Sequence, residues 1–436
     1  MMSRDREQKF EYQWYGSGSG WNALLPPRTP TAPLQGRNSA KYLIVGAGFT
    51  GLGAARRLAE LDPSADIIVI DRDEVGENSS GRNSGNSTRN VAWTPERTPP
   101  KNSEEYFNGQ GFLWLAQICK EHNIDWRMSV SNMLRGTRTD SGRAILEAQF
   151  KKYDKIGLKP VLYEGEDLYR KVGTRFYKTV LHYGESYDIN PAALIRGLAD
   201  NLPKQVALYE RTVMRSMHRQ GKGWRVETDG GVIDAEVLLL CMNGFVKEFG
   251  VGSNKLVSLY TYCSLSEVVP DNQAHLLGEW KAWGMTSVRR IGSSTHRRLA
   301  SNRFMLRSLH SYEERFPLQF VAEQLTEKFH RRFPELSHIK LEHVWGGLTD
   351  MTRNGAPLWG EIEDGLWVST GYNGLGITKG SYLGRRLAER ITGDTSDVPV
   401  EQSYGIANWI PPEPFRKVGF EWVTSIGMKR AGGDTL

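Results

Sequence analysis

Short apolar runs and one amphipathic stretch alternate near the start of the chain. Residues 41–45 and 67–70 are apolar runs bounded by polar or glycine-rich segments, which predicts two buried β-strands. Between them, apolar residues recur at spacings of three or four across 52–61, which predicts a helix that ends before Pro63. A strand–helix–strand unit of this length is typical of a parallel sheet.

Later segments change character twice. Residues 255–345 are richer in alternating strands, which indicates an antiparallel sheet, and the chain then returns to strand, glycine loop and helix. We therefore predict an α/β fold in which a Rossmann-like domain is interleaved with an antiparallel-sheet domain. Residues 1–40 are expected to form an arm without regular elements, and a less regular region is expected from 161 onward. The other predicted strands are 206–209, 212–214, 223–228, 232–235, 237–242, 260–265, 287–291, 303–306 and 366–369, and the other predicted helices are 104–123, 192–201, 312–333 and 378–391.

Composition excludes several classes of protein. The chain has 436 residues with 13 Trp, 17 Tyr and 15 Phe, too many aromatic residues for wholesale disorder. Its longest apolar stretch, 237–242, is too short for a membrane span. Three cysteines and a polar N-terminus without a signal peptide predict a cytoplasmic protein. The net charge of +6, without a Lys/Arg block, argues against nucleic-acid binding; it fits an anionic cofactor or substrate, or simply a solvated surface.

Glycine is the one residue type in clear excess. The chain has 46 glycines among 436 residues, more than a tenth, whereas glycine makes up about 7% of an average protein. One cluster, Gly46-Ala47-Gly48-Phe49-Thr50-Gly51, lies between the first predicted strand and helix, and Asp71 ends the next strand 20 residues later. This is the full context of a dinucleotide fingerprint. The glycines permit a tight turn, close approach of a pyrophosphate and close helix–strand packing, and the helix N-terminus attracts the phosphates.

The acidic residue after the second strand restricts the nucleotide. Asp71 can accept the hydroxyls of an adenosine ribose and disfavours a 2′-phosphate, although the adjacent Arg72 leaves that possibility open. The fingerprint alone does not choose between NAD and FAD. A single copy near the N-terminus favours FAD, and a glycine-rich turn in an ordinary α/β domain is the alternative without function.

Four further segments carry a family resemblance. Residues 77–86 (ENSSGRNSGN), 187–194 (YDINPAAL), 345–357 (WGGLTDMTRNGAP) and 371–377 (GYNGLGI) occur in this order. Together with the fingerprint, they resemble the D-amino-acid-oxidase-like FAD oxidoreductases, a family that includes glycine, sarcosine and γ-glutamylputrescine oxidases. The N-terminal arm is most similar to the γ-glutamylputrescine-oxidase branch. Asn354 stands where the family has Asp, a mild change at a turn.

The resemblance implies an FAD site made of loops far apart in the sequence. The fingerprint would hold the pyrophosphate, Asp71 and Arg72 the adenosine end, and the backbone of Val213 the adenine. Two more loops would lie at the isoalloxazine ring. The first, beside the ring, consists of Arg82, Asn83, Ser84, Gly85 and Asn86, and the second, at its N1/O2 edge, consists of Gly374, Leu375, Gly376, Ile377 and Thr378.

The resemblance also divides the chain. An arm (1–37) would precede an FAD-binding domain built from 38–100, 186–250 and 346–400. A substrate domain would comprise 101–185 and 251–345, and 401–436 would be a C-terminal extension. Because no His or Cys lies near the flavin loops, the FAD is expected to be non-covalent.

The implied reaction is oxidation of an amine or amino acid, with hydride transfer from the C–H bond next to nitrogen to flavin N5, giving an imine that hydrolyses. O₂ or another acceptor would reoxidise the flavin. Trp345, Tyr372 and Arg289 are the candidate catalytic residues, with Arg289 or Arg290 able to clamp a carboxylate.

Other interpretations stay open at this point. Tyr260 and Tyr262 are further substrate-contact candidates, but alternating Arg and Tyr residues can equally form the solvated face of a sheet. A flavin monooxygenase shares the fingerprint, although it usually has a late Gly-Asp motif that is lacking here. A nucleotide-binding protein without turnover is the third reading.

Overall fold

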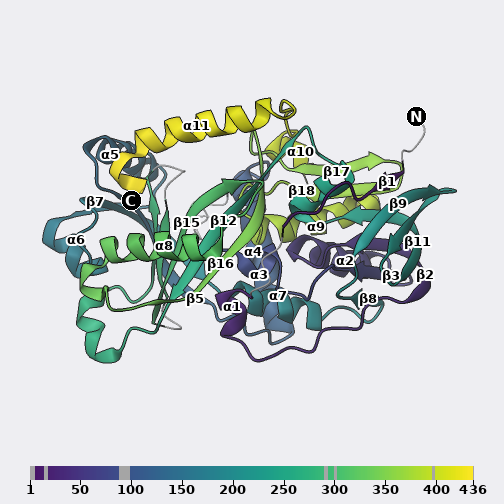
Figure 1. Ribbon diagram of the computed structural model, residues 1–436, viewed down its shortest axis with the longest axis horizontal. Coiled ribbons are helices and arrows are strands. Elements are labelled where there is room, and N and C mark those ends of the chain that lie inside the picture. Colours follow the sequence, from purple (N-terminus) through teal and green to yellow (C-terminus); the bar gives the residue numbers. More distant parts are fainter. Residues whose placement is uncertain are drawn as a thin grey trace.

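Two large sheets lie side by side along the long axis of the molecule (Figure 1). This arrangement comes from a computed structural model, which describes residues 5–13, 18–87, 99–288, 293–298, 302–394 and 398–435. The chain crosses repeatedly between the sheets, which confirms the predicted interleaved α/β fold. The domain boundaries proposed from the sequence stay a prediction. The helices are α1 (Gly20–Ala23), α2 (Phe49–Leu61), α3 (Ser79–Arg82), α4 (Glu104–Glu121), α5 (Asp140–Lys155), α6 (Gly165–Val172), α7 (Pro191–Asp200), α8 (Leu318–Arg332), α9 (Thr378–Ile391), α10 (Val400–Tyr404) and α11 (Phe415–Ala431).

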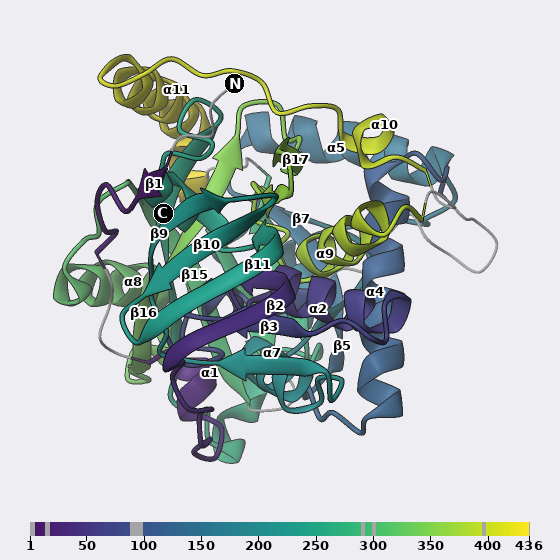
Figure 2. The same cartoon turned by 90° about the vertical axis from the view of Figure 1, so that its right-hand side faces the viewer.

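The first sheet contains the predicted strand–helix–strand unit. Its order is β1-β9-β10-β11-β2-β3-β8, and β18 joins β11 and carries β17 (Figure 2). The strands β8, β3, β2, β11 and β18 run parallel, as their apolar runs predict, because both faces of the sheet are covered. Its strands are β1 (Arg6–Glu7), β2 (Gly36–Val45), β3 (Ile67–Ile70), β8 (Val206–Tyr209), β9 (Met214–Gln220), β10 (Gly223–Thr228), β11 (Gly231–Leu240), β17 (Leu358–Glu363) and β18 (Leu366–Thr370).

The second sheet is antiparallel except where β13 pairs with β5. Its order is β16-β12-β15-β14-β13-β5-β7-β4, with β6 on β7. One face packs on α8 around a core of Tyr, Trp, Phe and Leu side chains. Its strands are β4 (Asn86–Ser87), β5 (Ser129–Thr137), β6 (Val161–Glu164), β7 (Thr179–Asp188), β12 (Leu256–Ser266), β13 (Trp283–Ser287), β14 (Ser294–Arg298), β15 (Arg303–Tyr312) and β16 (Leu341–Thr352).

Glycines let α2 and α9 cross at close range, which brings two predicted cofactor loops together. A β-carbon on Gly384 of α9 would lie 2.1 Å from Thr50 O, and one on Gly53 of α2 would lie 2.7 Å from Ser381 O. No residue with a side chain fits at either position without moving the backbone of the other helix. The beginnings of both helices are therefore fixed next to each other.

Five expectations from the sequence are wrong in detail. The arm contains β1 and α1, because Arg6–Glu7 pairs with β9 and Ser19 caps Gly20–Ala23. The segment from 161 onward is regular, forming β6 and α6. The strand predicted at 212–214 begins only at Met214, and β11 runs without a break through the predicted gap at 236. Helix α8 begins at Leu318, since β15 continues to Tyr312.

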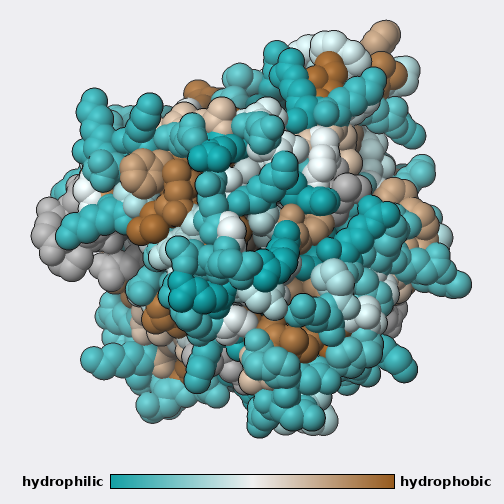
Figure 3. Space-filling model, turned by 90° about the vertical axis from the view of Figure 1, so that its left-hand side faces the viewer, coloured by the Kyte–Doolittle hydropathy of each residue, from teal (hydrophilic) through white to brown (hydrophobic). Residues whose placement is uncertain are grey.

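No helix among the described residues is both long and apolar enough to cross a membrane. Surface apolar groups on the end of the molecule that carries α5 and α6 form small, scattered patches among hydrophilic ones (Figure 3).

Candidate functional site

The fingerprint glycines each serve a separate steric purpose. Gly46 has a φ of +108°, and a β-carbon there would lie 2.6 Å from the carbonyl oxygen of Cys241, the residue that follows β11. A β-carbon on Gly51 would lie only 1.8 Å from Gly46 O. The turn from β2 into α2 therefore admits glycine alone at these two positions.

The N-terminus of α2 offers backbone donors. Gly48 is the N-cap and has no side chain to satisfy the first N–H groups of the helix. Only Ser80 comes near: its Oγ accepts the Phe49 N–H at 3.2 Å, and it would lie 2.8 Å from a β-carbon on Gly48. A hydroxyl oxygen at this place shows that the helix end favours an electron-rich partner, as a phosphate would be.

Asp71 follows β3 and points back at the fingerprint. Its Oδ2 accepts the Ala47 N–H at 2.7 Å, and its Oδ1 accepts the Asp73 N–H at 3.0 Å. Burial raises the pKa of Asp71 to about 6, although these two hydrogen bonds favour the ionised form. The carboxylate keeps further lone pairs for the hydroxyls of a ribose.

Arg72 is turned toward other carboxylates. It pairs with Glu11 of the arm and lies 3.4 Å from Glu248, with its guanidinium 5.3 Å from the centre of the Phe245 ring. Because two acidic groups already neutralise this arginine, its placement does not favour the 2′-phosphate that the sequence left open.

The loop after α3 is held from both sides. The Arg82 side chain is buried, and its Nη1 donates to Gly346 O at 3.1 Å. Asn83 folds onto its own loop, accepting the Gly85 N–H at 2.9 Å and donating to Ser80 O at 2.8 Å. Ser84 lies between these two fixed residues and is half-buried. The loop is thus rigid before any ligand binds.

Asn86 connects this loop to the second sheet. Its Nδ2 donates to Ser186 Oγ at 3.1 Å and lies 3.5 Å from Asp188 Oδ1. Asp188 is buried with Arg298 Nη1 at 3.5 Å and His296 Nδ1 at 3.6 Å. Burial alone would raise the pKa of Asp188, but the positive charge of Arg298 holds it below the ordinary value.

The C-terminal glycine loop lies open above the start of α9. Gly374 has a φ of +85°, and neither Gly374 nor Gly376 would place a β-carbon within 4 Å of another atom. Leu375 is 38% exposed, whereas Ile377 and Thr378 are buried. The loop therefore has backbone donors at a helix N-terminus and free space over them.

Tyr372 anchors that loop to the fingerprint. Its hydroxyl donates to Ser369 O at 2.5 Å and accepts from Thr50 Oγ1 at 2.7 Å. Burial raises the pKa of Tyr372 well above its ordinary value. These contacts fix the backbone between β18 and α9 against the start of α2.

Trp345 is fully buried on β16. Its indole N–H donates to Arg82 O at 2.9 Å, and its ring meets the Trp21 ring edge-on at 5.8 Å. Trp21 in turn donates to Asn83 O at 2.7 Å. The two tryptophans together hold the carbonyl groups of the loop that follows α3.

The remaining predicted residues are more dispersed. Val213 lies between β8 and β9, and its carbonyl accepts the Asp229 N–H at 3.3 Å. Arg289, together with Arg290, lies outside the described residues. Tyr260 and Tyr262 are fully buried in the core beneath α8, so they do not form a solvated face.

Sequence reasoning missed Arg307. Its strand position pairs across the sheet with Cys263, which pairs with Trp345, so all three side chains lie on one face. That face is the one that meets the loop after α3, through the indole of Trp345. Arg307 is half-buried and donates to Ser294 Oγ at 3.4 Å, without an ion pair to any carboxylate among the described residues. The position of Arg307 beside this loop follows only from the pairing of the strands that carry Arg307, Cys263 and Trp345.

These features fit a bound FAD. The fingerprint turn, the acidic residue after β3 and the open C-terminal loop are contiguous through the Thr50–Tyr372 contact. The space next to Gly374 and Gly376 is free, so a cofactor could approach the protein backbone there. The fold and the site together are typical of a dinucleotide-binding protein.

Comparison with known proteins specifies this class. Residues 41–390 match the family described as FAD dependent oxidoreductase, and the chain belongs to that family. It is 24% identical over 401 residues to "Probable oxidoreductase OrdL" of Rhizobium meliloti (strain 1021), covering 89% of this chain and 90% of that one. It is 24% identical over 382 residues to "Gamma-glutamylputrescine oxidoreductase" of Escherichia coli (strain K12), covering 85% and 87%.

A solved structure shows the same fold. The crystal structure of glycine oxidase from Geobacillus kaustophilus superposes with a TM-score of 0.70 at 17% identity, covering 84% of this chain and 98% of that one. The family match over residues 41–390 shows that the protein is an FAD-dependent oxidoreductase, so the predicted family and cofactor are confirmed.

Proposed function

We propose that this enzyme oxidises an amine or amino acid that carries an anionic group, at the C–H bond next to nitrogen. Bound FAD supplies the acceptor for the two electrons of that bond. The substrate loses a hydride from carbon and a proton from nitrogen, and water hydrolyses the resulting imine. Support for an amine substrate comes from the relatives, among them a γ-glutamylputrescine oxidoreductase and a glycine oxidase.

The position of Arg307 is the observation that supports an anionic group on the substrate. Arginine offers a planar pair of donors that matches a carboxylate. Here it stands two strands away from Trp345, roughly 10 Å at the usual strand spacing, on the face toward the loop after α3. A half-buried guanidinium without a carboxylate partner in the described chain is a costly arrangement unless a ligand completes it.

The other site residues would position the cofactor loops and stabilise charge on the cofactor. Tyr372 and Trp345 spend their polar atoms on Thr50, Ser369 and Arg82, so we assign them positioning roles in place of direct catalysis. The backbone N–H groups at the start of α9 would stabilise negative charge that develops on the cofactor. No His or Cys among the described residues of the flavin loops offers a covalent attachment, which supports non-covalent FAD.

The test combines a spectrum with a matched pair of variants. The purified holoenzyme is mixed anaerobically with carboxylate-bearing amines and with the same amines lacking the carboxylate, and bleaching of the flavin bands is followed. We expect Arg307→Gln to weaken apparent binding of the carboxylate-bearing amine by about 10- to 100-fold, the cost of a charge-assisted hydrogen bond.

The matched control is Arg303→Gln on the same strand, where the arginine pairs with Glu342. Equal losses in both variants would refute the assignment of Arg307. Bleaching by NAD(P)H alone would favour a flavin monooxygenase. A protein that binds FAD and responds to no amine would refute the proposed reaction. Electron acceptors are compared by reoxidising the bleached enzyme with O₂ or with an artificial dye.

A further inference from the structure

The C-terminal helix leaves an unusual set of apolar side chains in solvent. In α11, Phe415 is 69% and Trp422 is 67% exposed, and Val418 and Val423 are exposed as well. Of the residues of this helix, only Ala431 is buried. Single exposed apolar residues are common on proteins, but a contiguous group that includes large aromatic rings marks an interaction surface.

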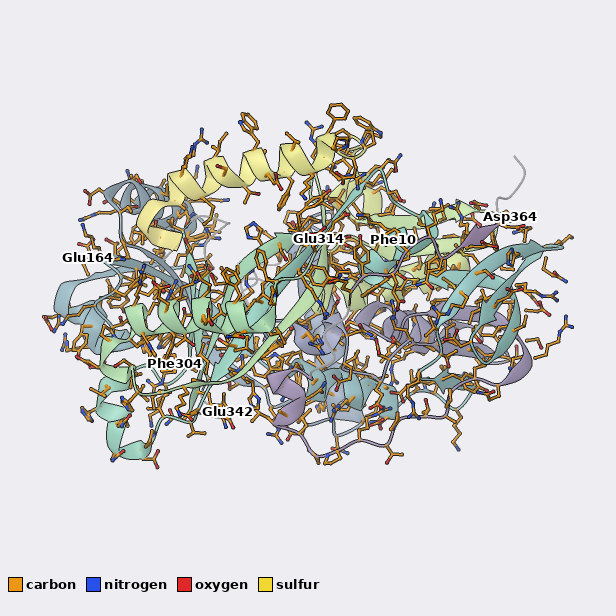
Figure 4. The ribbon with its side chains drawn as sticks, in the orientation of Figure 1. Phe10, Glu164, Phe304, Glu314, Glu342 and Asp364 are labelled. Carbon is orange, nitrogen blue, oxygen red and sulfur yellow. The ribbon has the colours of Figure 1, made fainter. Side chains whose placement is uncertain are left out.

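The helical period puts these side chains on one face. Phe415, Val418 and Trp422 follow each other at spacings of three and four, with Val423 beside them. The opposite face carries Phe420, whose ring lies 5.2 Å from the ring of Tyr312. Figure 1 shows α11 lying along the outside of the molecule, and Figure 4 shows side chains of this helix projecting away from the body.

Contacts at both ends hold the helix in this orientation. Before α11, Glu413 accepts a hydrogen bond from the hydroxyl of Tyr312. After α11, the buried carboxylate of Asp434 accepts hydrogen bonds from Thr137 Oγ1 at 2.8 Å and from the Arg138 N–H at 2.6 Å. The helix is thus fixed at two points, and its apolar face is directed outward.

The segment between α10 and α11 carries two more exposed apolar residues. Ile406 is 68% exposed and Trp409 is 58% exposed. We call the four exposed apolar residues near the start and middle of α11 the C-terminal apolar surface. They are Phe415, Val418, Trp422 and Val423.

Positive charge accompanies this surface. Lys417, Lys429 and Arg430 are exposed on α11, against one exposed acid, Glu421. The whole chain, with these residues included, has a net charge of +6. A surface that presents aromatic and aliphatic groups among cations is complementary to a layer that is apolar inside and anionic outside.

We propose that the C-terminal apolar surface docks this enzyme on an anionic lipid bilayer. Phe415 and Trp422 would lie at the boundary between headgroups and acyl chains, where tryptophan is favoured. Lys429 and Arg430 follow Trp422 and Val423 by seven residues each, so they share that helix face and would contact lipid phosphates. The docking is peripheral, because a 17-residue helix with five charged side chains does not span a bilayer.

A second copy of the chain is the competing occupant. Two copies would each bring the same excess of positive charge to the contact, which opposes association, whereas an anionic bilayer attracts it. The charge therefore favours lipid over self-association.

Vesicle sedimentation tests the proposal on the full-length holoenzyme. We expect binding to phosphatidylcholine vesicles that contain about one third phosphatidylglycerol, weak binding to pure phosphatidylcholine, and loss of binding as salt is raised several-fold. The double variant Phe415→Glu/Trp422→Glu removes two apolar anchors and is expected to weaken binding by about 100-fold or more.

The control variant is Val268→Glu, an exposed apolar residue outside this surface. It should bind vesicles as the unmodified enzyme does, and all proteins should keep their flavin spectrum, which separates this result from the proposed reaction. Absence of binding to any vesicle would overturn the proposal. So would equal binding to neutral vesicles, or a concentration-dependent dimer in analytical ultracentrifugation that the double variant abolishes.

Discussion

Replacing Asp71 tests the structure of the nucleotide end of the site. The two carboxylate oxygens accept N–H groups of Ala47 and Asp73, and their remaining lone pairs would be available to the ribose hydroxyls of bound FAD. Asp71→Asn removes the charge and puts an N–H group against one of these backbone donors. A charge-assisted hydrogen bond contributes about 1.5–3 kcal/mol, so FAD should bind about 10- to 150-fold more weakly near neutral pH.

The pH dependence gives a sharper signature. Burial raises the pKa of Asp71 to about 6 in the free protein, so the carboxylate is ionised above that pH and protonated below it. FAD hydroxyls need the ionised acceptor. The dissociation constant of the wild-type protein should therefore rise about tenfold for each pH unit below about 6, and that of Asp71→Asn should stay nearly constant.

The assay is titration of the deflavinated protein with FAD, followed by quenching of flavin fluorescence. Asp71→Glu keeps the charge and should keep the pH dependence, even if the longer side chain weakens binding. Asp73→Asn alters a neighbouring carboxylate in the same loop and should have little effect. Wild-type affinity that does not vary between about pH 5 and about pH 7.5, together with normal binding by Asp71→Asn, would refute the reasoning.

Three further predictions concern stability and the loops. Burial raises the pKa of Asp350 to about 6 from the ordinary 3.8, so the folded state binds the proton more tightly than the unfolded state does, and the free energy of unfolding falls as pH rises through this range. Asp350→Asn should remove this pH-dependent loss of about 3 kcal/mol in the free energy of unfolding. The melting temperature of the variant should therefore depend less on pH than that of the wild type. Gly51→Ala should abolish folding, because its β-carbon would lie 1.8 Å from the carbonyl oxygen of Gly46. Gly376→Ala has free space around the new β-carbon, so this variant should melt as the wild type does and bind FAD weakly. Equal melting temperatures for the two variants would contradict this prediction. Trp345→Phe leaves Arg82 O without its donor and should lower the unfolding free energy by about 1–3 kcal/mol in denaturant titration, and an unchanged midpoint would count against a positioning role.

Much of the fold follows from local pattern. The strand–turn–helix–strand unit around Gly46 and Gly51 is encoded within about 30 neighbouring residues, because turn geometry and apolar period are properties of short segments. The alternation of segment types also indicates two interleaved sheets, as observed. Boundaries were less predictable: α8 begins six residues later than its apolar period suggests, because pairing of β15 with β12 extends the strand to Tyr312.

The glycine-rich loops that we expect to hold FAD stand out in the sequence, whereas the residues that we propose to lie near the substrate do not. Arg307, His296 and Arg298 lie on strands whose neighbours come from distant parts of the chain, and nothing near them in sequence distinguishes them from other strand arginines and histidines. Conversely, Tyr260 and Tyr262 resemble a polar strand face in the sequence and are core residues in the fold.

By itself, the sequence determined the nucleotide turn, because a positive φ and a close backbone approach demand glycine wherever they occur. Only the tertiary structure decided which side chains face the cofactor loops and which apolar residues stay in solvent. Strand register sets the first, as at Arg307, and the anchoring of α11 at its two ends sets the second. The physical reason is the same in both cases: the direction of a side chain depends on contacts between segments far apart in the chain, which no local pattern records.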